Sequence, residues 1–411
     1  MPQQSPAHRD TIRALTGVRF LAAFHVVCFH YASGPIGLPF ARHIIENGWM
    51  AVNLFFILSG FVLTYNYAER QLAAQTFWVA RFARIYPAYL LGFVLIAPAV
   101  AVRLGSHPMK LLGCAAATGG LVQGWFPSIA LTWNGPGWSL SSEAFFYLLF
   151  PFLLPVCARL SDKKLLLAII LSCGVEIAIP AIDILAYGSK YGHAILYMPI
   201  FRLPDFILGI MTAQVYLRGW RNFPARGMLF AVSMALAVFT AVLFPVVPAD
   251  FRAPLATPLF ALMVYSLAGD RGLLARFLAC RPIYALGDAS YSVYILQSPI
   301  MAYYLYFTQR SAATLSVSRA PLGWGGFILY SAILIGLSLG CYTYIERPAR
   351  LRISALWSNR IWTRPARSDA VTIGNNGHGM DELNLLAAGV ATAPGKTLAQ
   401  HDRISDSLGV Q

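Results

Sequence analysis

Charged side chains are scarce in this sequence of 411 residues. Lysine, arginine, aspartate and glutamate together make up 12% of the chain, whereas soluble domains average about 25%. Hydrophobic residues make up 57%. This composition excludes an ordinary soluble domain and predicts a membrane protein.

Several enzyme motifs are missing as well. The chain has no Walker phosphate loop, no GxGxxG dinucleotide pattern, no HExxH helix and no GxSxG nucleophile turn. ATP-driven transport and zinc hydrolysis therefore lack their usual sequence support. The six cysteines form no CxxC pair and no metal-ligand spacing, so we expect packing residues there and no metal site.

Apolar windows of about 20 residues predict ten spans and an all-α, polytopic transmembrane helical bundle. The windows lie near 14–34, 48–68, 83–104, 138–159, 164–186, 196–217, 226–247, 254–270, 283–307 and 323–345. The run 111–126 is shorter and rich in glycine and alanine, and we interpret it as a re-entrant or surface helix inside a loop. We expect the first span to remain as a membrane helix, because it lacks a small-residue cleavage site.

The net charge of +14 is distributed unevenly among the loops. With the N-terminus inside, the short inside segments hold fourteen lysines and arginines, and the outside loops hold seven. Such an excess marks cytoplasmic loops rather than a nucleic-acid surface, so we predict that both termini are cytoplasmic. The chain then divides into a cytoplasmic segment 1–13, a membrane domain 14–350 and a cytoplasmic tail 351–411 that is basic and then disordered.

The first predicted span carries ionisable residues, which are costly in a membrane and usually kept for function. Arg19 and His30 are eleven residues apart, which places them on one helix face about 16 Å apart along the axis. His25 lies about 140° round from His30 and points elsewhere. Imidazole suits proton transfer or acyl capture near neutral pH, so His30 is a candidate general base or nucleophile.

Two further spans carry candidate functional groups. Arg81 and Arg84 are three residues apart and suit an anion clamp, because paired guanidiniums grip phosphates through forked hydrogen bonds. Anchoring at the cytoplasmic face also explains this pair. Glu143 lies near the predicted start of the fourth span, with Tyr147 one turn further on. This glutamate either caps the helix or approaches His30 and raises its basicity.

Other polar positions in apolar spans have structural interpretations. Ser59 and Gly60 permit close helix packing, and the spacing of Arg202 and Asp205 is typical of an internal ion pair. Asn53, near the outer end of the second span, is a polar group that requires a partner.

Seven segments in order resemble the acyltransferase-3 family of integral-membrane acyltransferases. They are Arg19-x10-His30, FFILSGFVL, Arg81-x-x-Arg84 followed by IYP, WSLSSEAFFYLLFP, RLPDFILG, LGDASYSVYIL and YIERP, and they cover roughly 12–350. The resemblance implies about ten helices in a bacterial inner membrane and an acyl-CoA donor, most of all acetyl-CoA, on the cytoplasmic side. It also implies transfer of an acetyl or short acyl group to a hydroxyl of a carbohydrate or glycosylated acceptor.

The family's functional residues map onto this sequence one by one. Its arginine–histidine pair corresponds to Arg19 and His30, its double arginine to Arg81 and Arg84, and its glutamate to Glu143. In the resulting hypothesis the double arginine holds the phosphates of CoA and His30 is the base or the acyl acceptor. Glu143 orients His30, and Arg19 steadies the donor or a developing oxyanion.

The chain departs from the family pattern at two positions. Gln297 stands where the family often has histidine, and glutamine cannot accept a proton at neutral pH; Asn53 stands where an acidic residue is common. No SGNH-type esterase domain is evident, so relay to a fused soluble domain is not expected. The alternative hypothesis is a non-enzymatic carrier or flippase for a lipid-linked glycan, because the same buried groups would line its path.

Overall fold

The computed structural model describes residues 6–32, 39–69, 72–219, 228–238, 246–270, 272–309 and 322–362, and these segments contain helices but no strand. The longer helices are α1 (Pro6–Tyr31), α3 (Ala51–Tyr67), α4 (Ala74–Leu104), α6 (Trp138–Ala158), α7 (Asp162–Tyr187), α9 (Leu203–Leu217), α11 (Ala249–Gly269), α14 (Ser290–Gln309), α15 (Trp324–Cys341) and α16 (Arg347–Trp362). The shorter ones are α2 (Pro39–Glu46), α5 (Pro108–Gly119), α8 (Gly192–Tyr197), α10 (Met228–Val238), α12 (Leu273–Ala279) and α13 (Arg281–Asp288), with single turns η1 (Gly48–Met50), η2 (Gln123–Trp125), η3 (Gly135–Gly137), η4 (Pro199–Arg202) and the π-helical η8 (Tyr342–Glu346). The all-α prediction is confirmed.

Eight helical segments in the described part are long and apolar enough to cross a membrane. They are Arg13–Tyr31, Gly48–Tyr67, Ala74–Leu104, Gly135–Ala158, Asp162–Tyr187, Pro199–Leu217, Ala249–Gly269 and Trp324–Trp357. Each coincides with one of the ten predicted spans, and the chain is a multi-pass membrane protein. The other two predicted spans, 226–247 and 283–307, overlap α10, described over 11 residues, and α13 with the 20-residue α14.

The run predicted as a re-entrant or surface helix contains α5, which has 12 residues. A helix of that length extends about 18 Å, which is too short for a hydrocarbon core of about 30 Å. The structure therefore agrees with a helix inside a loop and not with an eleventh span.

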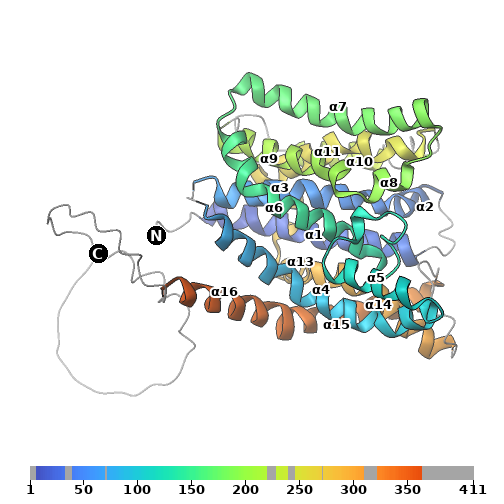
Figure 1. The fold of residues 1–411 in the computed structure, drawn as a ribbon. Coiled ribbons are helices and arrows are strands. Elements are labelled where there is room, and N and C mark those ends of the chain that lie inside the picture. Colours follow the sequence, from blue (N-terminus) through green and yellow to red (C-terminus); the bar gives the residue numbers. More distant parts are fainter. Residues whose placement is uncertain are drawn as a thin grey trace, which may run out of the picture. The chain divides into compact units, whose positions relative to one another are not determined.

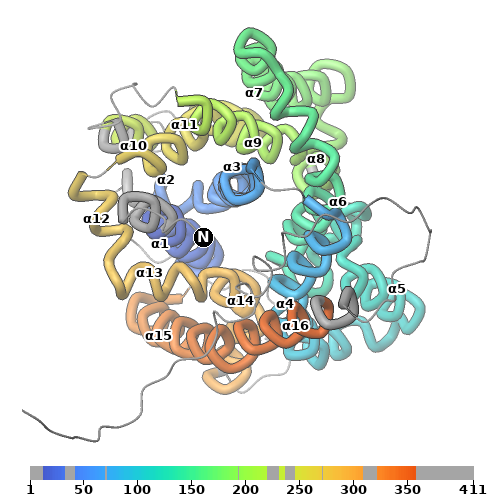
Figure 2. The backbone as a smooth tube through the Cα atoms, turned by 90° about the vertical axis from the view of Figure 1, so that its left-hand side faces the viewer, coloured from blue at the N-terminus to red at the C-terminus, as the bar shows by residue number. Residues whose placement is uncertain are grey.

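Helices α1 and α3 lie inside a ring of other helices, as Figure 2 shows along the bundle and Figure 1 from its side. Helix α1 packs against α11, α12, α13 and α14, and α3 packs against α9 and α11. Helix α7 lies outside α9 and α11 and packs on both. Arg19 and His25 of α1 thus lie among other helices and not in the lipid.

A very close contact between helices α3 and α9 involves two glycines. A Cβ atom on Gly60 of α3 would lie 2.2 Å from the carbonyl oxygen of Phe206, and one on Gly209 of α9 would lie 2.1 Å from that of Ile57. No side chain fits at such distances, so the two backbones touch directly. The interpretation of Ser59 and Gly60 as a packing site is confirmed.

The last helix, α16, extends to Trp362, so the beginning of the predicted basic tail is helical. The predicted disorder begins at about Ser368 and lies outside the described residues. The cytoplasmic assignment of segments 1–13 and 351–411 remains a prediction.

Candidate active site

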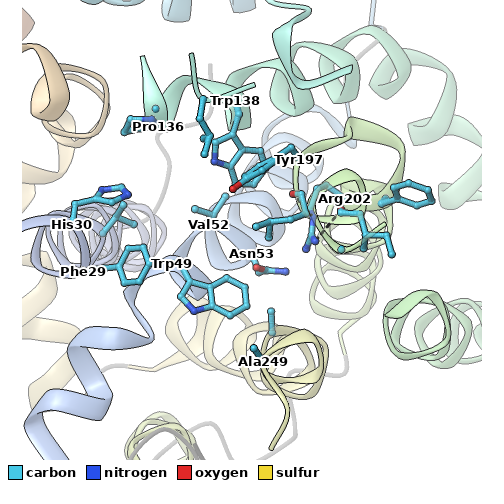
Figure 3. Close-up of a pocket in the computed structure, with 18 of the residues that line it drawn as sticks. Phe29, His30, Trp49, Val52, Asn53, Pro136, Trp138, Tyr197, Arg202 and Ala249 are labelled. Carbon is cyan, nitrogen blue, oxygen red and sulfur yellow. Dashed lines mark hydrogen bonds between the residues drawn. The ribbon is translucent and has the colours of Figure 1, made fainter. Parts of the chain in front are cut away.

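A cavity of about 700 Å³ lies at the end of the bundle where α1, α4 and α7 end and where α3, α6 and α11 begin. Its wall combines aromatic, polar and charged side chains, and its volume is typical of small-molecule sites. Figure 3 shows His30 and Arg202 on opposite sides of the cavity. The rings of Trp138 and Tyr197 meet edge to face in the wall, with their centroids 5.3 Å apart.

His30 lines this cavity near the end of α1, and its Nδ1 lies 2.9 Å from Gln297 Oε1 on α14. The side-chain nitrogen of Gln297 donates to the carbonyl oxygen of Tyr294 at 2.8 Å, a role that only the NH₂ group fills. The Gln297 oxygen therefore faces His30, and Nδ1 is the nitrogen that donates. In the neutral ring, Nε2 is then the basic nitrogen.

His25 has a different environment from His30. Its Nε2 lies 2.7 Å from the carbonyl oxygen of Ile44 on the short helix α2, and the cavity wall does not include it. Helical periodicity therefore correctly predicted that His25 points away from His30. The bond between His25 and Ile44 is a packing contact between α1 and α2.

Arg19, Arg81, Arg84 and Glu143 meet at a second place, about three turns along α1 from His30. Arg19 lies within electrostatic range of the other three residues and of Tyr147. The Tyr147 hydroxyl donates to Glu143 Oε1, and its ring centroid lies 6.0 Å from the Arg81 guanidinium carbon. The buried Nε of Arg81 has no hydrogen-bond partner in the described part of the chain. We call Arg19, Arg81 and Arg84 the arginine cluster.

The described hydrogen bond of His30 Nδ1 goes to Gln297 Oε1, whereas the sequence suggested Glu143 as the partner of His30. The reason is position along α6: this helix begins at the cavity residue Trp138, so Glu143 lies about 7.5 Å further along its axis. There it lies near Arg19. It is also beyond the first turn of α6, so the capping alternative is wrong.

Asn53 has the partner that the sequence required. Its Nδ2 donates to Asp205 Oδ2 at 2.8 Å, and the Thr257 hydroxyl lies 3.2 Å from Oδ1 of the same buried carboxylate. Arg202 donates through Nε and Nη2 to two carbonyls of α8, at 3.2 and 3.1 Å. The guanidinium is thus held by backbone oxygens, and the expected direct ion pair with Asp205 is not formed.

Sequence reasoning missed several charged residues of the cavity wall, among them Glu176 of α7. A carboxylate in an apolar span is the signal that should have identified it. The aromatic wall residues Trp138 and Tyr197 had no comparable signal, because aromatic residues are common throughout the spans. Within the described segments no group of three or more histidine, cysteine, aspartate or glutamate side chains is placed to hold a metal ion.

The fold and the site together define a multi-pass membrane protein with ionisable side chains inside its helical bundle. The family model of the acyltransferase domain matches residues 12–345. The chain therefore belongs to the acyltransferase-3 family, and it is an O-acyltransferase. Membership of this family favours the enzyme over the carrier or flippase of the alternative hypothesis.

Several curated proteins are similar to the chain. Acyltransferase MdmB of Streptomyces mycarofaciens is 30% identical over 321 residues, which cover 71% of this chain and 79% of the relative. Peptidoglycan O-acetyltransferase OatA of Listeria monocytogenes is 24% identical over 371 residues, or 83% of this chain and 56% of the relative. O-acetyltransferase OatA of Staphylococcus aureus is 21% identical, and the chain spans 57% of its length. No solved structure matches the chain significantly.

Proposed function

We propose that the protein transfers an acetyl or short acyl group from acyl-CoA to a hydroxyl of a carbohydrate or glycosylated acceptor. Acetyl-CoA is the favoured donor in this proposal. The observation that carries this proposal is the pairing of the His30 cavity with the arginine cluster along α1. The name of the Listeria relative, which acts on peptidoglycan, supports a carbohydrate acceptor. We also propose a bacterial inner membrane with both termini in the cytoplasm, which the loop charges support.

The arginine cluster is the proposed donor site. Its three guanidiniums suit the phosphates of CoA, which forked hydrogen bonds hold well. The Nε of Arg81 has no hydrogen-bond partner within the described residues, so it is available to a ligand. The extended pantetheine arm of CoA then bridges the roughly 16 Å along α1 between Arg19 and His30.

His30 is the proposed catalytic residue. Its Nε2 takes the proton of the acceptor hydroxyl while the hydroxyl oxygen attacks the thioester carbonyl. A C–O bond forms, the C–S bond breaks, and the proton passes from Nε2 to the leaving thiolate, so protons balance. The same nitrogen would carry the acyl group if His30 acted as the nucleophile.

Glu143 and Arg19 take supporting roles in this scheme. Glu143 places a carboxylate near Arg19 and offsets the repulsion among three neighbouring guanidiniums. Arg19 belongs to the donor site and steadies the donor there, because about 16 Å along α1 separates it from an oxyanion that forms at His30. In this proposal Glu143 therefore positions the donor site and does not act through His30.

The test uses purified full-length protein with radiolabelled acetyl-CoA, and an acceptor found by mass spectrometry of glycans and metabolites from cells with and without the gene. His30→Ala should lower transfer by about 10²–10⁴-fold, the usual cost of losing a general base. His25→Ala is the matched control on the same helix and should remain within about threefold of wild type, because it loses one contact to Ile44. Near-normal transfer by a stably inserted His30→Ala protein would refute the proposal.

A further inference from the structure

Helix α7 presents one polar face to the protein and an apolar face to its surroundings. Leu167, Ile170 and Leu171 are exposed, whereas Glu176 and Asp183 are buried on the side that packs on α9 and α11. Asp183 is satisfied, because both its oxygens accept from the backbone N–H of Tyr191. Glu176 is the carboxylate on this face whose bonding is incomplete.

Glu176 is 4% exposed and lines the cavity. The backbone N–H of Asp205 and the guanidinium of Arg202 lie within electrostatic range of its carboxylate. Its Oε1 has no hydrogen-bond partner among the described residues. An unpaired carboxylate oxygen in a membrane span is unfavourable, so a wall position of this kind indicates a group that a ligand completes.

The surroundings of Glu176 show what kind of ligand would complete it. Arg202 donates to two carbonyls of α8, and no described hydrogen bond joins it to Glu176, so Oε1 of Glu176 can accept a hydrogen bond from a ligand. The rings of Trp138 and Tyr197 also line the cavity and suit the apolar face of a ring. His30 lies across the cavity from Arg202 (Figure 3).

We propose that Glu176 is the acceptor-recognition residue of this enzyme, and that its Oε1 accepts a hydrogen bond from a second donor group of the acceptor, a hydroxyl or an ammonium. This inference rests on the proposed function, because it requires the reacting hydroxyl at His30. It adds that the acceptor must carry two functional groups. One is the hydroxyl that is acylated at His30, and the other is a hydrogen-bond donor that reaches Glu176. An alcohol with a single hydroxyl leaves Glu176 unpaired and is rejected, since an unsatisfied buried polar group opposes binding.

The experiment compares wild type, Glu176→Ala, Glu176→Gln and His30→Ala in cells, and it measures by mass spectrometry the ester that depends on the gene. Binding of radiolabelled acetyl-CoA is measured in parallel on each purified full-length protein. Alanine makes α7 more apolar, so insertion should survive. Glu176→Ala should lower the ester about tenfold or more, as expected for a lost hydrogen bond to a charged group, with acetyl-CoA binding within about twofold.

The variant Glu176→Gln distinguishes an acceptor hydroxyl from an acceptor ammonium as the group that bonds to Glu176. Glutamine keeps an oxygen acceptor, so an acceptor hydroxyl should retain most of its acylation, whereas an ammonium should lose it as fully as with alanine. Ser172→Ala is the matched control, because Ser172 lies one turn away on the buried face of α7, bonds to its own helix at Ala168 and does not line the cavity. The amount of ester should stay within about twofold of wild type, because one neutral hydrogen bond contributes little free energy.

The outcomes distinguish this inference from the proposed function. An ester that persists in His30→Ala overturns the proposed function, and the inference fails with it. An ester lost in His30→Ala but normal in Glu176→Ala overturns the inference alone. Loss of acetyl-CoA binding in Glu176→Ala also overturns it, because the residue would then act on the donor or on the fold.

Discussion

The Nδ1 nitrogen of His30 and the Oε1 oxygen of Gln297 lie 2.9 Å apart and join α1 to α14. Gln297 is fully buried, and its backbone carbonyl accepts from the Tyr330 hydroxyl at 2.8 Å. Its side chain also donates to the Tyr294 carbonyl, so the amide has one orientation. A residue that cannot act as a base thus holds the histidine in the tautomer that leaves Nε2 basic.

This contact predicts that Gln297→Leu lowers the turnover number about tenfold or more, because the imidazole loses the group that fixes its tautomer. Gln297→Glu should recover part of the loss, since a carboxylate oxygen also accepts from Nδ1. Steady-state kinetics on purified protein, with the Michaelis constant for acetyl-CoA measured separately, check this.

The control for that prediction is Tyr330→Phe, which removes a hydrogen bond to the same residue's backbone but leaves the contact with His30 intact. Its turnover number should stay within about threefold of wild type, because one neutral hydrogen bond contributes little free energy. Equal losses in Gln297→Leu and Tyr330→Phe would show a packing role and contradict tautomer control.

The helices and the candidate residues on them could be predicted because both follow from local patterns. Apolar length located the spans, and helical periodicity separated His25 from His30. The hydrogen-bond partners of these residues could not be predicted, because they depend on the axial offset between neighbouring helices. Glu143 matched the family motif but lies deeper in the bundle than His30, and Gln297, interpreted as a lost base, is the residue that bonds to it.

The contact of α3 and α9 predicts that Gly209→Ala destabilises the protein. The new Cβ would lie 2.1 Å from the Ile57 carbonyl oxygen, so the two backbones must separate. Overpacking of this kind costs about 1–3 kcal/mol. Thermal unfolding of the purified protein should show a lower midpoint than for Gly336→Ala on α15, where a Cβ meets nothing within 4 Å. Equal midpoints would show that the helices adjust freely.

The proposed orientation predicts an external location for a reporter fused after Lys190 and an internal one for a reporter fused after Arg276. Lys190 follows α7 at the end of the bundle that holds the cavity, and Arg276 lies on α12, which packs on α1. Paired phosphatase and fluorescent-protein fusions measure this. An internal signal after Lys190 would place the His30 cavity on the cytoplasmic side and overturn the proposed orientation.

The donor site predicts that Arg81→Lys raises the apparent Michaelis constant for acetyl-CoA about tenfold and changes the turnover number much less. Lysine keeps the charge but cannot form two parallel hydrogen bonds to a phosphate, so ground-state binding of the donor suffers most. Arg103→Lys is the matched control: this arginine is near the other end of α4, donates to the Thr132 carbonyl and lines the cavity. Its Michaelis constant for acetyl-CoA should match wild type. If Arg81→Lys and Arg103→Lys raise that constant equally, the arginine cluster is not where the phosphates of the donor bind.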